Sequence, residues 1–165
     1  EKMNFKKFLN NIEEILCAIC LSVMIIIAFM NVVSRFLLSA SLSFTDEITT
    51  YLFVLLSLMG SAVAAKRGAH LGLTVLTDIV SPSVKKILKI IGFVFAIIFS
   101  SSIFYYGIFM VQSQMQRGQV TANMQWAEWI FGSFVPIGAF FLTLRFIQVL
   151  IAEIKTKPET EKEEV

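Results

Sequence analysis

Four long runs without a charged side chain constrain this chain more than any other feature of its sequence. The runs cover residues 15–34, 48–65, 90–116 and 129–144, and the last one continues to residue 152 past a single charge, Arg145. A helix rises ~1.5 Å per residue and therefore needs ~20 apolar residues to cross ~30 Å of hydrocarbon. We predict four transmembrane helices, at about residues 14–37, 46–66, 86–112 and 127–151.

Composition excludes a soluble globular protein. Hydrophobic residues make up 56% of the chain and charged residues 16%, whereas charged residues are ~25% of an ordinary soluble domain. A membrane β-barrel is also excluded, because barrel strands alternate between apolar and polar residues and these runs are apolar on every face. The first run is longer than the core of a secretory signal, so we interpret it as an anchor. The predicted fold is all-α integral membrane, with one four-helix domain at residues 1–155.

The basic residues predict the orientation of the helices. Of the fourteen Lys and Arg residues, twelve lie before the first run, between the second and third, or from Arg145 onward, and only Arg35 and Arg117 lie on the other side. Because cytoplasmic segments carry the basic excess, we expect both termini and the middle connection to be cytoplasmic. Trp126 and Trp129, with the three tyrosines, are then expected to form a belt at the outer membrane boundary.

Two segments outside the runs have the pattern of amphipathic helices. Residues 70–80 carry apolar side chains at helical spacing, and residues 4–12 repeat the pattern more weakly. We expect both segments to lie along the cytoplasmic interface, and the charged tail at 156–165 to be disordered. The residues expected at the lipid headgroups or the membrane boundary are Lys66, Arg67, His70, Lys85, Lys86, Lys89, Trp126 and Trp129.

Two adjacent acids, Asp46 and Glu47, precede the second run. They would occupy the first turn of a helix, where the helix dipole favours negative charge, and Ser43 has capping-box spacing to Asp46. Capping of the helix N-terminus is by itself enough to explain the two acids. A second interpretation adds a structural ion pair with Arg35, which ends the first span on the same side, with Asn31 one turn earlier. We favour a cap plus a structural pair over a proton or ion pathway, because all these groups lie at helix ends.

Small residues recur at four-residue spacing in and just after the second run. Such spacing lets helices approach closely when lipid provides no hydrophobic drive for association. We therefore predict a helix-packing seam made of Ser57, Gly60, Ser61, Ala64, Ala65 and Gly68.

The sequence contains few residues suited to catalysis or to binding a metal or cofactor. The four uncharged runs hold no carboxylate for protons or cations, and His70 is the only histidine, which excludes a haem with two axial imidazoles within this chain. Cys17 and Cys20 are the only cysteines and are interpreted as packing residues. We find no phosphate-binding loop and no nucleophile with a base. The sequence therefore predicts no enzyme, no metal site and no cofactor in this chain.

One stretch resembles a known family. Residues 31–73 place Asn31 and Arg35 at the end of the first span, and an aromatic residue and two acids at the start of the second, namely Phe44, Asp46 and Glu47. A basic and glycine-rich string then follows: Lys66, Arg67, Gly68, His70, Leu71 and Gly72. This pattern resembles the small, Q-type (DctQ-like) membrane subunit of tripartite ATP-independent periplasmic (TRAP) transporters. Phe44 stands where the family commonly has Trp, and Asp46 where Glu is usual.

The resemblance implies a supporting role in transport. In that family an extracytoplasmic binding protein delivers an organic acid, such as a sialic acid or a C4-dicarboxylate, to a large membrane subunit. The large subunit moves the substrate with sodium, and the small subunit acts as its scaffold. The resemblance therefore implies a multi-pass protein of the bacterial inner membrane whose partners are these two proteins and lipid, with sodium bound by the large subunit and no nucleic acid partner. Because the sequence ends after a polar tail, we expect the two membrane subunits to be separate polypeptides.

Two other functions remain open on the sequence alone. A stand-alone small transporter or channel would need polar groups that converge between the spans, and the candidates are mostly hydroxyls that can bond to their own backbone. A membrane anchor for a redox complex would need a cofactor, for which the chain supplies no ligand set. The scaffold interpretation is the one we favour.

Overall fold

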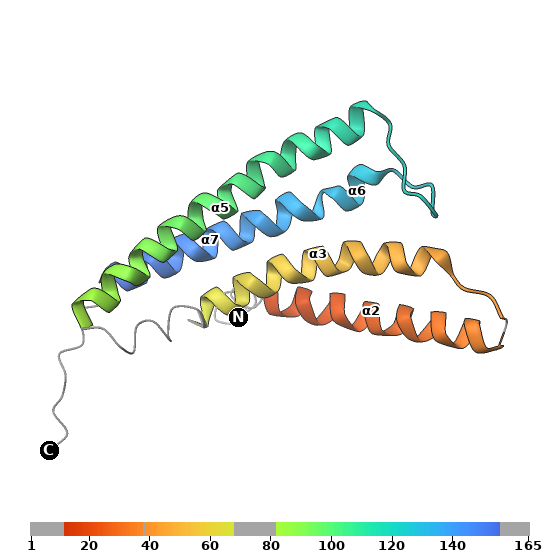
Figure 1. The fold of residues 1–165 in the computed structure, drawn as a ribbon, viewed down its shortest axis with the longest axis horizontal. Coiled ribbons are helices and arrows are strands. Elements are labelled where there is room, and N and C mark those ends of the chain that lie inside the picture. The colour runs from red at the N-terminus through yellow and green to blue at the C-terminus, as the bar shows by residue number, and fades with distance from the viewer. Residues whose placement is uncertain (1–11, 38, 68–81, 156–165) are drawn as a thin grey trace, which may run out of the picture.

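The computed structural model describes residues 12–37, 39–67 and 82–155, and within them the chain is helical (Figure 1). The helices are α2 (Ile12–Leu37), α3 (Ser43–Lys66), α5 (Pro82–Gln116), α6 (Glu128–Gly132) and α7 (Phe134–Lys155). Counting α6 and α7 together, four helical segments are long and apolar enough to cross a membrane. The prediction of an all-α chain with four spans is confirmed. The interfacial helices expected at 4–12 and 70–80 and the tail at 156–165 lie outside the described residues, except that residue 12 begins α2.

The helices lie in a row rather than in a closed bundle. Along this row α2 packs on α3, α3 on α7 and α7 on α5, so α2 and α5 form its edges (Figure 1). The core of buried residues lies where α3, α5 and α7 meet, and consists of Ala62, Ala65, Phe93, Leu142 and Phe146. Large apolar side chains on both edge helices are exposed, among them Phe29 and Phe95. Such surfaces suit lipid or a membrane partner, not water.

The layer of helices has a charged end and a loop end. The charged end holds the start of α2 and the end of α3, including Glu13, Glu14, Lys66 and Arg67, and the nearby Arg145 of α7. The loop end holds residues 39–42 and 117–127. Local sequence sets the helix limits there: α5 ends before Gly118, whose φ of +59° suits glycine and whose N–H bonds to the Met115 carbonyl at 3.2 Å.

The contact between α5 and α7 follows a seven-residue repeat. Phe93, Ser100, Gly107 and Gln114 are all buried on α5. Ser100 is hydrogen-bonded to the Thr143 hydroxyl at 2.9 Å, and a Cβ on Gly107 would lie 3.2 Å from Cδ of Pro136. Small and polar residues therefore bring the two backbones close together, as expected for helices that associate within lipid.

The fourth span is divided at Ser133 into α6 and α7. Pro136 has no N–H and so cannot bond to the carbonyl of Gly132, four residues earlier. The helical hydrogen bonds to the residue four positions earlier resume at Ile137, whose N–H bonds to the Ser133 carbonyl at 3.1 Å. The interruption therefore falls where the proline removes a hydrogen bond.

The six residues predicted as a packing seam on the second span differ in burial. Of these, Ala65 is buried, Gly60 and Ala64 are half-buried, Ser57 and Ser61 are exposed, and Gly68 lies outside the described residues. The close approach to α7 runs instead through Leu58, because a Cβ on Gly138 would lie 2.7 Å from the Leu58 Cβ. Both helices contribute small residues to their contact, since Ala62 and Ala65 of α3 and Gly138 and Ala139 of α7 are all buried.

Candidate functional site

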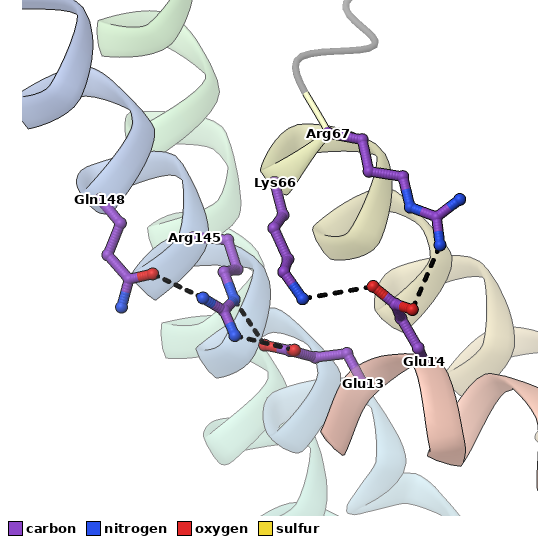
Figure 2. A network of polar contacts seen from close by, with 6 residues as sticks. All are labelled: Glu13, Glu14, Lys66, Arg67, Arg145 and Gln148. Atoms are coloured by element: carbon purple, nitrogen blue, oxygen red, sulfur yellow. Dashed lines mark hydrogen bonds and ion pairs between the residues drawn. The ribbon is translucent and has the colours of Figure 1, made fainter. Parts of the chain in front are cut away.

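A buried ion pair connects α2 to α7 at the charged end. Arg145 donates from Nε to Oε1 of Glu13 at 2.7 Å and from Nη2 to Oε2 at 2.9 Å. Glu13 is 2% exposed and the Arg145 side chain 12%. The remaining terminal nitrogen, Nη1, donates to Oε1 of Gln148 at 2.7 Å (Figure 2). This is the two-pronged geometry in which arginine binds a carboxylate most strongly.

The sequence explains why the pair forms between these two residues. Arg145 is the only charge in the last apolar run, and an ionised side chain at that depth requires an opposite charge. Glu13 lies in the first turn of α2, where the helix dipole favours an acid. The antiparallel order of the helices places that first turn beside α7 and next to the last turn of α3 (Figure 2).

Weaker ion pairs surround the buried one. Glu14 contacts Lys66 and Arg67 at 3.2 Å each, but its side chain is 33% exposed. Exposed pairs of this kind add little to stability, because water and salt screen the charges. Lys89 of α5 contacts Glu153 of α7 at 3.3 Å. The charged end is thus held by pairs that join α2 to α3, α2 to α7 and α5 to α7.

At the loop end a single carboxylate holds a loop. Glu47, in the first turns of α3, accepts hydrogen bonds from the backbone N–H groups of Ala122 at 2.7 Å and of Asn123 and Met124 at 3.2 Å each. Successive backbone N–H groups that converge in this way form a binding concavity for an anion. Here the anion is a side chain of the same chain, so the loop before α6 is joined to α3.

The ion pair predicted between Arg35 and the two acids is not present among the described residues. Glu47 is engaged by the loop instead, and Asp46 is exposed. The predicted cap also differs, because Leu42 is the N-cap residue and Ser43 already belongs to α3, which has no side-chain cap. Asn31 does contact the connection between α2 and α3, since its Oδ1 accepts the Leu42 N–H at 3.0 Å.

Comparison with known proteins identifies the family. The family model described as "Tripartite ATP-independent periplasmic transporters, DctQ component" matches residues 24–156, which is most of the chain. The chain belongs to this family. It is a TRAP transporter small permease subunit, a multi-pass protein of the bacterial inner membrane and not an enzyme.

Three relatives show how similar the chain is to other members. It is 39% identical over 84 residues to a putative TRAP transporter small permease protein of Haemophilus influenzae, a match that covers 51% of this chain and 52% of the relative. It is 24% identical over 151 residues to the sialic acid TRAP transporter small permease protein SiaQ of Vibrio cholerae, covering 91% and 86%. It is 22% identical over 149 residues to the ectoine TRAP transporter small permease protein TeaB of Halomonas elongata, covering 90% and 77%.

The residues predicted at the membrane boundary have mixed placements in this DctQ-family subunit. Lys66, Arg67 and Lys89 form ion pairs, and Lys86 donates to the Ile154 carbonyl at 3.4 Å. Trp126 and Trp129 are exposed near the loop end. His70 and the side chain of Lys85 lie outside the described residues. Contact with lipid headgroups stays a prediction for all of them.

The geometry of the subunit supports a role in holding helices in position rather than in catalysis or metal binding. Within residues 12–37, 39–67 and 82–155, no three His, Cys, Asp or Glu side chains gather as a metal site would require. Sequence reasoning missed the Glu13–Arg145 pair and the Glu47 loop contact. The first had a usable signal: a lone arginine in an apolar run needs a partner, and Glu13 precedes another run on the side where Arg145 was expected. The second had none, since backbone N–H groups can donate hydrogen bonds to any nearby carboxylate.

Proposed function

We propose that this chain is the scaffold subunit of a sodium-coupled, binding-protein-dependent TRAP transporter for an organic acid, and that it braces the large transport subunit in the membrane. One observation carries the proposal. The polar contacts of Glu13, Arg145 and Glu47 join parts of the described chain that lie far apart in the sequence, α2 to α7 and α3 to the loop before α6. The exposed sides of the edge helices are largely apolar. Such a chain is suited to fixing the position of a membrane partner.

The shape of the layer supports a large partner. A single row of helices leaves both of its broad sides uncovered by its own chain, whereas a closed bundle would bury them (Figure 1). Large apolar side chains such as Phe53 of α3 and Phe140 of α7 are exposed even on the two central helices. A partner of similar length could pack along them, as helices do in lipid.

The proposal places the binding sites for sodium and substrate in the partner proteins and not in this chain. Among the described residues no cluster of carboxylates is available to coordinate a cation, so the proposal places sodium in the large subunit. Two of the relatives named above belong to a sialic acid and an ectoine transporter, which supports a small organic acid as the substrate. We further propose that the charged end is cytoplasmic and that the loop end faces the periplasmic binding protein.

Reconstitution tests this function. Liposomes would contain this chain alone, the co-expressed large membrane subunit alone, or both, with an inward sodium gradient and the binding protein loaded with sialic acid or a C4-dicarboxylate. The proposal expects uptake only when both membrane subunits are present, and expects the two to purify together. Flux through this chain alone would contradict it, as would full uptake by the large subunit alone.

A further inference from the structure

The layer consists of two helical hairpins joined along one contact. The first hairpin is α2 with α3 and the second is α5 with α6 and α7, and they meet where α3 packs on α7. In Figure 1 the two hairpins are inclined to each other. Their contact includes the close apolar crossing of Leu58 and Gly138. Apolar crossings of helices tolerate several angles, because ridges and grooves can interdigitate in more than one way.

Directional polar contacts lie at both ends of this crossing. Near the end of α3, the Glu13 clamp joins the hairpins through the two hydrogen bonds between Glu13 and Arg145. At the start of α3, the Glu47 clamp joins them through the N–H groups of Ala122, Asn123 and Met124. An α-helix as long as α3 spans ~36 Å, so the two clamps act far from the crossing and on opposite sides of it.

The chemistry of the Glu13 clamp is unusual for a contact that serves stability alone. Burying an ion pair removes the water around both charges, and their mutual attraction hardly offsets that free-energy cost. Apolar residues of similar volume often give equal or greater stability. The best-attested role of such buried polar pairs is to select one arrangement among several. The Glu47 clamp is similarly selective, because three N–H groups reach one carboxylate only when the loop and α3 are in one relative position.

We propose that Glu13 and Glu47 are positioning residues that fix the angle between the two hairpins, and thereby the shape of the surface that the large transport subunit binds. The inference rests on the proposed scaffold function and adds the residues through which it would operate. The partner is a membrane protein with apolar helices, because the surface whose shape the clamps set is the exposed apolar side of the layer.

The angle itself is measurable in the chain without its partner. Spin labels at Phe29→Cys on α2 and Tyr106→Cys on α5, both exposed positions, would report the separation of the hairpins after Cys17 and Cys20 are replaced by alanine. Pulsed spin–spin distances would be recorded in lipid nanodiscs. We expect Glu13→Gln and Glu47→Ala each to shift or broaden the distance distribution. The neighbouring acids supply matched controls, Glu14→Gln and Asp46→Ala, which should leave it unchanged.

Transport by the complete complex tests the functional step. We expect Glu13→Gln and Glu47→Ala to lower the maximal rate of sodium-driven uptake, by about tenfold for Glu13→Gln because it leaves Arg145 buried without a counter-charge. The substrate concentration for half-maximal uptake should stay the same, since the binding site is elsewhere. The double variant Glu13→Gln with Arg145→Gln should recover most of the rate, because two amides can still bond to each other and neither is charged.

Each result of the distance and uptake measurements either supports or overturns the proposal. Unchanged distances in both clamp variants would overturn the proposal, as would altered distances with unaltered uptake. Altered distances, a lower maximal rate and recovery in the double variant would support it. Failure of the scaffold function itself would appear elsewhere, as uptake by the wild-type chain alone or by the large subunit alone.

Discussion

Arg145 of α7 donates two hydrogen bonds to the carboxylate of Glu13 in the first turn of α2, although 132 positions separate the two residues. This contact joins the first described helix to the last across the end of α3. Because Glu13 is almost wholly buried, neither charge has water as an alternative partner. The pair therefore links the fold of the subunit to the charge state of two side chains.

The first prediction concerns the energy of this pair. Arg145→Gln alone should lower the free energy of unfolding by ~3–5 kcal/mol, because it leaves the Glu13 carboxylate buried without its partner. Replacing both residues by leucine should restore stability to near or above that of the wild type. Thermal unfolding of the purified subunit in detergent measures both. A double leucine variant less stable than Arg145→Gln would contradict the prediction.

The second prediction concerns the crossing of α3 and α7. Gly138→Ala should destabilise the subunit by ~1–3 kcal/mol, because its Cβ would lie 2.7 Å from the Leu58 Cβ and the helices would have to separate. Gly60→Ala is the matched control, since no atom lies within 4 Å of the added Cβ, and it should be neutral or slightly stabilising. Equal effects of the two substitutions on the unfolding temperature would refute this account.

The third prediction concerns a buried amide. Oε1 of Gln114 is buried beside Gly132 and has no hydrogen-bond donor among the residues that the structure describes. Gln114→Met keeps a similar length and removes the unsatisfied oxygen, so it should stabilise the subunit by ~1 kcal/mol or more. The unfolding temperature in detergent checks this, with Gln112→Met at an exposed site of α5 as the control. A loss of stability specific to Gln114→Met would show that the amide has a role in holding α5 against α6.

The fourth prediction separates Arg35 from Glu47. Arg35→Ala should change the free energy of unfolding by less than ~0.5 kcal/mol, because the residue is exposed and forms no ion pair with Asp46 or Glu47. Glu47→Ala should cost ~1–3 kcal/mol, since it leaves backbone N–H groups of the loop without their acceptor. Limited proteolysis within residues 117–127 should then rise for Glu47→Ala alone. Equal cleavage of both variants would contradict the assignment.

The fifth prediction concerns orientation. If the loop end is periplasmic, a single cysteine at Ser41→Cys in a cysteine-free background should react with a membrane-impermeant maleimide applied to spheroplasts. Lys155→Cys at the other end of the layer should react only after the membrane is opened. The reverse pattern would show that the distribution of basic residues misled the topology prediction.

The sequence by itself determined that this chain makes four helical spans. Uncharged runs of this length can satisfy their backbone hydrogen bonds in lipid only as helices, so length and composition sufficed. The family resemblance around residues 31–73 was likewise readable, because its motif lies within one stretch of chain.

Tertiary structure alone decided which polar groups meet. Glu47 could have bonded to Arg35 from the preceding helix, but the loop after α5 presents three N–H groups to it instead. The side of α3 that packs on α7 carries Leu58, Ala62 and Ala65, whereas Ser57 and Ser61 are exposed. Charged and small residues can serve any neighbour within reach, and their neighbours are set by the order of the helices in the row, which no local pattern encodes.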